Sequence, residues 1–371
     1  MAAPTTAPTD LFPARSARGM LAEMAVVTVV GAGMMGTALC HPLLDAGHDV
    51  RLVGTHLDRE IVASLKAQGH HPKLALDIPR AIRPFFLEEL GAAMDGVELI
   101  GVGVSSAGVR WAGEVLAPYV RPDRPVVMIT KGLEWSGTAL TTLPDVLERT
   151  LGPELVGRIC PAAVAGPCIA GELARRVETC VVLTGRDAAK LERLRSALMT
   201  PYYHPFVSAD VLGVEVCAAL KNAYAMGIAF ALGMHEKSGG VPGSIAQHNY
   251  EAAVFAQSVR EMRALVRAVG GDPESASGLP GVGDLDVTTN GGRTGRFGKL
   301  LGLGLTVPRA VEQMQGATLE CLDILRVMQT ALPALKAEGN LASDAVPLLE
   351  HLIEVALGDR PVAMPFARFF R

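Results

Sequence analysis

One long apolar run dominates the pattern of hydrophobic and polar positions along the chain. From Val214 to Met234 nearly every residue is aliphatic, Met or Phe, a composition that favours helix formation and burial together. The pattern predicts a single buried helix of about 21 residues. Three strongly polar residues interrupt this helix, and they are Glu215, Lys221 and Asn222.

An apolar run of this length is also compatible with a membrane span. Two ionisable side chains inside the run, and the lack of a second comparable stretch, argue against a span because charge is costly inside a bilayer. In a buried helix, Lys221 needs an ionic partner or must lose its charge. From this run alone, a lysine that extends to the surface and a catalytic lysine explain the pattern equally well.

Before this helix the chain alternates between strand and helix patterns, which predicts an α/β fold with a doubly wound parallel sheet. Strands are predicted at 25–30, 49–54, 97–104, 125–130, 158–167, 177–185 and 202–208. After Val211 the pattern is almost wholly helical. Helices are predicted at 211–234, 244–270, 297–302, 307–315, 318–333 and 344–357.

A glycine motif lies directly after the first predicted strand and opens a helix. Gly31, Gly33 and Gly36 have the spacing G-x-G-x-x-G, with Met34 and Met35 between the last two. These glycines permit a tight turn, close approach of a pyrophosphate to the backbone, and packing of the helix on the strand. The helix N-terminus then faces the phosphates. A glycine turn without a ligand is the alternative, but the strand–turn–helix context favours a dinucleotide site formed by these five residues.

The motif indicates a Rossmann-type dinucleotide-binding domain over residues 25–210, followed by an all-helical substrate-binding domain over 211–371. Residues 1–24 are rich in Ala, Pro, Thr and Arg and lack the apolar segment of a signal peptide, so we expect a disordered extension there. The choice between NAD and NADP stays open. An acidic residue about 20 positions after the motif would bind the ribose of NAD, but the chain has Arg51 and His56 there and no carboxylate between Arg51 and Asp58.

Further polar residues follow the predicted strands, where ligands of such sheets bind. Ser105 and Ser106 follow the strand 97–104, and Lys131 follows the strand 125–130. We expect these side chains at the rim of the cofactor crevice, and a solvated loop lysine is the alternative for Lys131.

A glycine-rich stretch at 278–304 carries hydroxyl, acidic and basic side chains ahead of a predicted helix. Guanidinium groups and free backbone N–H groups in such a loop suit a phosphate. A flexible surface connection is the alternative.

Composition narrows the class of protein. The chain has 371 residues, is 49% hydrophobic and carries a formal net charge of −4, so it can form two cores and has no basic excess for nucleic-acid binding. Its six cysteines have no metal-ligand spacing and suggest a reduced, cytoplasmic protein without a metal site. The long apolar helices weakly favour a homodimer.

Together these stretches resemble the NAD(P)-dependent glycerol-3-phosphate dehydrogenases over nearly everything after residue 25. The resemblance rests on GAGMMG (31–36), TKG (130–132), AGPCIAGE (165–172), VEVCAALKNAYAMGIAFALG (214–233) and GVGDLDVTT…GGRTGRFGKLLGLG (281–304). Members of this family interconvert dihydroxyacetone phosphate and glycerol 3-phosphate with NAD or NADP. The resemblance therefore implies a small phosphorylated substrate.

The resemblance also implies roles for individual residues. Lys221 is expected to be the acid/base, with Lys131 polarising the substrate carbonyl and Asp284 supporting the lysines. The residues expected to hold the substrate are Asn222, Thr288, Arg293 and Thr294. The further residues expected at the cofactor are Ser105, Ala170, Glu172 and Glu320.

Several positions depart from the family pattern, and these are Glu251, Gln257, Ser258, Thr294 and Cys321. They lie at or near the expected substrate entrance, so a different small phosphorylated hydroxyketone is one alternative substrate. The β-hydroxyacid dehydrogenases, the nearest rival enzymes, have an asparagine one turn after the lysine, where this chain has Ala225. A non-catalytic dinucleotide-binding regulator is the alternative from another class, and the presence of both lysines with Asp284 and Arg293 argues against it.

Overall fold

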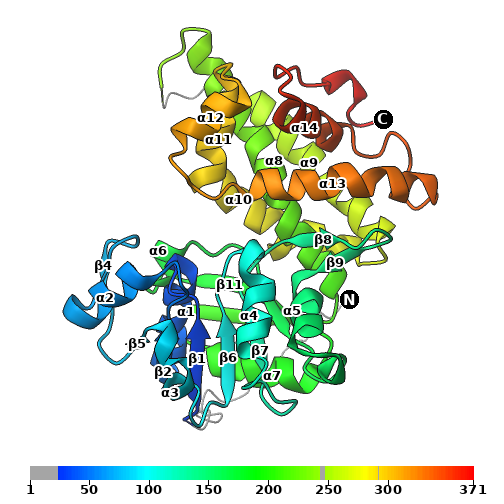
Figure 1. The fold of residues 1–371 in the computed structure, drawn as a ribbon. Helices are drawn as coiled ribbons and strands as arrows, with labels where there is room; N and C mark the ends of the chain where they lie inside the picture. The colour runs from blue at the N-terminus through cyan, green and yellow to red at the C-terminus, as the bar shows by residue number, and fades with distance from the viewer. Residues whose placement is uncertain (1–23, 243–246, 291) are drawn as a thin grey trace, which may run out of the picture.

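The structure is a computed structural model that describes residues 24–242, 247–290 and 292–371. An α/β layer structure is followed by a helical part, and the long helix α8 joins the two (Figure 1). The expectation of a disordered extension falls on residues 1–23, which lie outside the described ranges, as do the first three residues of the helix predicted at 244–270.

The central sheet has eight strands in the order β12-β11-β10-β7-β6-β1-β2-β5. Their bounds are β1 (Val26–Val30), β2 (Asp49–Val53), β5 (Arg83–Phe85), β6 (Leu99–Val102), β7 (Val126–Met128), β10 (Ala162–Ala165), β11 (Thr179–Thr184) and β12 (Tyr203–Ser208). All neighbours pair in parallel except β10 and β11, which are antiparallel. The predicted doubly wound parallel sheet is therefore confirmed, with one antiparallel pairing that the sequence pattern did not indicate. The connection between β10 and β11 contains only the four-residue helix α6, so it does not make the crossover that a parallel pair requires.

Helices cover both faces of the sheet because its strands are apolar on both sides. Val27 and Val29 of β1 pack in one core and Val30 packs in the other, as the alternation of a strand requires. The first core includes α1 (Met34–Asp45), α2 (Arg59–Gln68), α6 (Ala170–Leu173) and α7 (Ala188–Leu198). The second core includes α3 (Leu90–Ala93), α4 (Val109–Leu116) and α5 (Leu143–Leu151).

Helix α8 (Val211–Lys237) is the axis of the helical part. Asp210 begins it by accepting a hydrogen bond from the backbone N–H of Gly213 at 3.0 Å. By length and composition α8 could cross a membrane, but 89% of its most apolar 18-residue window is buried inside the protein. The helices around it are α9 (His248–Ala268), α10 (Asp284–Thr289), α11 (Gly292–Gly302), α12 (Val307–Gln313), α13 (Glu320–Ala337) and α14 (Pro347–Gly358).

Helices α8 and α11 approach each other closely because glycines line their contact. A Cβ on Gly298 would lie 2.3 Å from the carbonyl oxygen of Met226, and one on Gly302 would lie 2.2 Å from that of Phe230. Side chains at these positions would push the helices apart. The glycines of α11 therefore fix its distance from α8, and with it the position of the α11 N-terminus beside the middle of α8.

The glycine-rich stretch at 278–304 differs from its expected irregular structure. It forms a short helical turn (Leu279–Gly283), then α10, then α11, which begins five residues before the predicted helix at 297. Several of its glycines serve close helix packing, which the sequence pattern does not distinguish from loop flexibility. Five short strands among the described residues were also not predicted: β3 (His70–His71), β4 (Leu76–Asp77), β5 (Arg83–Phe85), β8 (Leu133–Trp135) and β9 (Leu140–Thr142).

Candidate active site

Two lysines and one aspartate from three parts of the chain meet at the start of α10. Asp284 is 1% exposed, and its Oδ1 accepts a hydrogen bond from the ammonium group of Lys221 on α8. Its Oδ2 accepts hydrogen bonds from Nζ of Lys131 at 2.6 Å and from the backbone N–H of Gly166 at 3.3 Å. Lys131 and Lys221 lie 153 and 63 residues from Asp284 in the sequence, and the fold brings all three together.

The edge of the sheet positions two members of this cluster. Lys131 follows β7, and Gly166 follows β10, the neighbouring strand. Gly166 has a φ of +113°, a conformation that side chains rarely adopt, and this turn directs its N–H towards Asp284. Lys131 also donates to the carbonyl oxygen of Gly166 at 3.4 Å. The carboxyl ends of the parallel strands therefore hold Lys131 and the backbone that supports Asp284.

Burial and charge set the protonation of the cluster. Burial lowers the pKa of Lys221, Asp284 opposes this shift and Lys131 adds to it, so that the pKa falls to about 8. Burial also lowers the pKa of Lys131, but the charge and hydrogen bond of Asp284 outweigh it and the pKa rises above its ordinary value. For Asp284, burial raises the pKa and the two lysines outweigh it, leaving the pKa lowered. Lys221 therefore carries the most easily released proton of the cluster.

The glycine turn has the geometry that a dinucleotide requires. Gly31 has a φ of +112°, and a Cβ there would lie 2.5 Å from the carbonyl oxygen of Gly103. A Cβ on Gly36 would lie 1.9 Å from the carbonyl oxygen of Gly31, whereas a Cβ on Gly33 would meet nothing within 4 Å. The space at Gly33 fits a pyrophosphate, because within the described residues its N–H donates no hydrogen bond.

The remaining residues expected at the cofactor lie on separate elements. Met34 and Met35 form the first turn of α1, where Met34 is 40% exposed. Ser105 is exposed just beyond β6, with no hydrogen bond of its side chain among the described residues. Ala170 and Glu172 lie on α6, which packs against α1.

The residues expected at the substrate occupy different environments. Asn222 is partly exposed beside Lys221, and its amide has no partner among the described residues. The hydroxyl of Thr288 donates to the carbonyl oxygen of Asp284 at 2.6 Å. Arg293 lies in the first turn of α11, correcting the expectation of a loop, and donates to Glu320 at 2.6 Å.

Four of the five positions that depart from the family pattern are buried, and these are Gln257, Ser258, Thr294 and Cys321. Thr294 is 5% exposed on α11. Gln257 is 2% exposed and donates to Glu261 at 2.7 Å. Glu261 also accepts the backbone N–H groups of Leu348 and Leu349 at the start of α14, so Gln257 belongs to a buried network between helices. Glu251 is partly exposed and pairs with His248 at 3.0 Å.

Two neighbours of the cluster received no role from the sequence. Cys168 follows the turn at Gly166, and burial raises the pKa of its thiol to about 11 although Lys131 opposes the shift. Glu215 is 0% exposed, and neither carboxylate oxygen has a partner in the described part of the chain. Burial raises the pKa of Glu215 to about 8, again against the effect of Lys131. In the sequence, the only indication of a role for Glu215 is that it is one of three strongly polar residues in an otherwise apolar helix.

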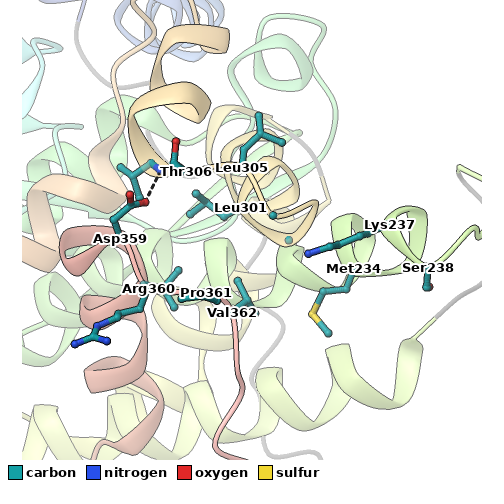
Figure 2. A pocket seen from close by; sticks show the side chains of 14 residues that line it. Met234, Lys237, Ser238, Leu301, Leu305, Thr306, Asp359, Arg360, Pro361 and Val362 are labelled. Atoms are coloured by element: carbon teal, nitrogen blue, oxygen red, sulfur yellow. Dashed lines mark hydrogen bonds between the residues drawn. The ribbon is translucent and has the colours of Figure 1, made fainter.

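A separate cavity of about 610 Å³ lies at the far end of α8 (Figure 2). Met234 and Lys237 from α8, Leu301 and Leu305 from the α11 side, and Val362 form part of its wall. Its lining contains none of the residues expected at the cofactor or the substrate. The candidate active site is therefore the region around Lys221, Lys131 and Asp284, not this cavity.

Comparisons with known proteins match both parts of the chain to one family. The model for the NAD-dependent glycerol-3-phosphate dehydrogenase N-terminus matches residues 26–190, and the model for the C-terminus matches residues 210–365. An NADP(+)-dependent glycerol-3-phosphate dehydrogenase of Archaeoglobus fulgidus is 34% identical over 78% of this chain and 84% of its own length. A glycerol-3-phosphate dehydrogenase [NAD(P)+] of Geobacter metallireducens is 31% identical over 90% of this chain and 93% of its own length.

Solved structures agree with these matches. The crystal structure of a glycerol-3-phosphate dehydrogenase from Coxiella burnetii has a TM-score of 0.74 and 26% identity, and the match covers 91% of this chain and 96% of that one. A Plasmodium falciparum structure has a TM-score of 0.77 at 15% identity over 94% of this chain and 96% of that one, which shows the fold alone.

Proposed function

The chain belongs to the NAD-dependent glycerol-3-phosphate dehydrogenase family, and we propose that it reversibly reduces dihydroxyacetone phosphate to glycerol 3-phosphate with NAD(P)H. It is an oxidoreductase that acts on a CH–OH group. The observation that carries the proposal is the buried contact of Asp284 with both Lys221 and Lys131, at the same edge of the sheet as the glycine turn.

The two lysines have different roles at the substrate carbonyl. When bound, the reduced nicotinamide supplies the hydride that attacks the carbonyl carbon. Lys221 gives its proton to the developing alkoxide, because its lowered pKa of about 8 makes it the stronger acid of the two lysines. Lys131 keeps its proton and polarises the carbonyl oxygen, because Asp284 raises its pKa. In the oxidation direction, neutral Lys221 accepts the proton of the alcohol.

The phosphate of the substrate would be held at the start of α11. Arg293 lies in the first turn of this helix, where the backbone N–H groups and the helix dipole also favour an anion. Its side chain is 43% exposed and one of its nitrogens pairs with Glu320. The remaining guanidinium donors are available to a phosphate. Asn222, with Thr288 and Thr294, completes the set that we assign to the substrate.

The cofactor residues that we assign are those of the glycine turn (Gly31, Gly33, Met34, Met35 and Gly36) together with Ser105, Ala170, Glu172 and Glu320. We further propose a preference for NADPH over NADH. The carboxylate of the loop after β2, Asp58, is 8% exposed and accepts three hydrogen bonds from the protein. All three bonds reach Oδ2, and at 8% exposure the carboxylate is turned towards the protein and not towards a site for the ribose hydroxyls of NAD. His56 lies exposed beside it and suits a 2′-phosphate.

We assign residues 25–210 to cofactor binding and residues 211–371 to substrate binding, in a cytoplasmic enzyme that acts as a homodimer and does not span the membrane. The burial of α8 supports the last point. Gel filtration with light scattering would test the dimer, and a monomer at micromolar concentration would contradict it.

The reaction is tested by mixing the protein with NADPH or NADH and dihydroxyacetone phosphate and following the absorbance of the reduced nicotinamide. We expect turnover with both cofactors and a larger kcat/KM with NADPH. In the Lys221→Met variant, kcat/KM should fall about 10²- to 10⁴-fold while NADPH still binds.

Three outcomes would contradict parts of the proposal. Turnover of another phosphorylated hydroxyketone in place of dihydroxyacetone phosphate would leave the mechanism and change the substrate. Binding of NADPH without turnover of any phosphorylated ketone would favour a regulator. Near-normal turnover by Lys221→Met would contradict the role of Lys221.

A further inference from the structure

Two residues outside the glycine motif hold the backbone of Ala32 from opposite sides. Nε2 of His71 lies 3.0 Å from the carbonyl oxygen of Ala32. Oδ2 of Asp58 accepts the backbone N–H of Ala32 at 3.2 Å. His71 is 0% exposed and Asp58 is 8% exposed, so both contacts are shielded from solvent. Asp58 lies in the loop after β2 and His71 lies on β3, so the segment between β2 and β5 supports the glycine turn.

The contacts of His71 and Asp58 with Ala32 set the direction of the backbone N–H of Gly33. The carbonyl of Ala32 and the N–H of Gly33 belong to one planar trans peptide unit, so they point in opposite directions. His71 and the hydroxyl of Thr37, at 3.3 Å, hold the oxygen of this unit. The N–H of Gly33 therefore points away from His71, and it has no acceptor among the described residues. Gly33 also has open space on the side where a Cβ would stand.

The hydrogen bonds of His71 define its protonation. The backbone N–H of Leu74 donates to Nδ1 at 3.1 Å, so Nδ1 accepts and Nε2 carries the proton that is donated to Ala32. Burial lowers the pKa of His71, Asp58 opposes this shift and Lys73 adds to it. The imidazole is therefore neutral at pH 7, and protonation of Nδ1 at lower pH would break the bond to Leu74.

We propose that His71 and Asp58 are positioning residues for the dinucleotide, which orient the N–H of Gly33 towards its pyrophosphate. The inference rests on the proposed function only for the presence of NAD(P)H. Neither residue touches the cofactor in this arrangement. They act through the peptide units on either side of Ala32, whose position decides whether the free N–H reaches a phosphate oxygen.

The experiment compares His71→Leu, which removes the donor, with His71→Gln, whose amide N–H can replace Nε2. His48→Leu is the matched control. His48 is 4% exposed, its Nε2 lies 3.1 Å from the carbonyl oxygen of Ala197, and its Nδ1 accepts the N–H of Ala25 at 3.2 Å. It thus has the same kind of contacts at the opposite end of β1. Dissociation constants for NADPH are measured by fluorescence without a ketone substrate, and thermal unfolding is measured in parallel.

We expect His71→Leu to raise the Kd for NADPH about tenfold, which corresponds to the loss of one hydrogen bond. His71→Gln should bind within about threefold of the unmodified protein. His48→Leu should lower the thermal midpoint as His71→Leu does, but leave the Kd unchanged. The variant Asp58→Leu should raise the Kd as His71→Leu does.

An unchanged Kd in folded His71→Leu would overturn the inference. Equal weakening in His71→Leu and His48→Leu would also overturn it, because it would show a general effect of lost stability. If NADPH binds and His71→Leu weakens it, but no phosphorylated ketone is turned over, the inference stands and the proposed reaction fails.

Discussion

Replacing Asp284 with asparagine removes the negative charge between the two lysines with little change in shape. In the unmodified protein this charge raises the pKa of Lys221, whereas burial and Lys131 lower it. Without the charge, only the two lowering effects remain. The pKa of Lys221 must then fall below its present value of about 8.

The size of this fall follows from the burial of the contact. At an effective dielectric constant of about 20, two unit charges about 4 Å apart interact by about 4 kcal/mol, or about 3 pKa units. Asp284 is 1% exposed, so solvent screens the contact little. Asparagine keeps one hydrogen-bond acceptor, which recovers part of the loss. We therefore expect the pKa of Lys221 to fall by about 2 to 3 units.

The assay is the pH dependence of kcat/KM in both reaction directions at saturating cofactor, since this parameter reports the enzyme before the other substrate binds. Ketone reduction needs protonated Lys221, so the unmodified enzyme should lose activity above about pH 8 and the variant above about pH 5 to 6. At pH 7 the variant should reduce the ketone about 10- to 100-fold more slowly. Alcohol oxidation needs neutral Lys221, so the variant should retain this activity at pH 6, where the unmodified enzyme loses it.

The opposite effects in the two directions separate this mechanism from simple damage. Asp286→Asn is the matched control, because Asp286 lies exposed on the same helix. It should leave both profiles unchanged. Two results for Asp284→Asn would refute the assignment of the proton to Lys221. One is that kcat/KM for ketone reduction still falls only above about pH 8, and the other is that kcat/KM is lowered equally in both directions at every pH.

Three further predictions concern single residues. Glu215→Gln should stabilise the protein. Because the pKa of Glu215 is raised from 4.5 to about 8, the folded protein keeps this proton while the unfolded chain releases it, so the stability of the unmodified protein falls as the pH rises from 4.5 to 8. The gain in unfolding free energy should then be about 2–3 kcal/mol larger at pH 8 than at pH 6, and urea unfolding that shows the same gain at both would contradict this. Arg293→Ala should raise the KM for dihydroxyacetone phosphate at least about tenfold with little change in the Kd of NADPH, and equal changes in both would place Arg293 elsewhere. His56→Ala should lower kcat/KM for NADPH more than for NADH, and an unchanged ratio would exclude His56 from a 2′-phosphate site.

The fold was largely predictable because its strands are short, apolar and β-branched, and because α8 is apolar over its whole length. The β8–β9 hairpin was not predictable, since its sequence LEWSGTALT has neither a long apolar run nor strict alternation. Helix α11 was only partly predictable. Its glycines at Gly295, Gly298 and Gly302 lower helix propensity, and close contact of Gly298 and Gly302 with α8 compensates for this in the folded protein.

The candidate site was predictable in its members but not in its contacts. The position of Lys131 after a strand indicated the edge of the sheet, and the resemblance to a family selected Lys221 and Asp284. The contact of one carboxylate with both lysines depends on distances across 153 and 63 residues, which no local pattern encodes. The roles of His71 and Asp58 were missed for the same reason, because hydrogen bonds to backbone atoms leave no side-chain motif.

The charge balance of the cluster explains why Lys221 is buried and does not extend to the surface. Lys221 is 8% exposed, and one aspartate faces two lysines, which leaves one positive charge in excess. This excess favours a substrate oxyanion, and it also lowers the pKa of Lys221 so that its proton can be released. An ionised Glu215 near Lys131 would cancel the excess. Burial, with no partner among the described residues, keeps Glu215 neutral below about pH 8. The apolar surroundings of this carboxyl therefore lower the stability of the protein, but they also preserve the excess positive charge on which the proposed chemistry depends.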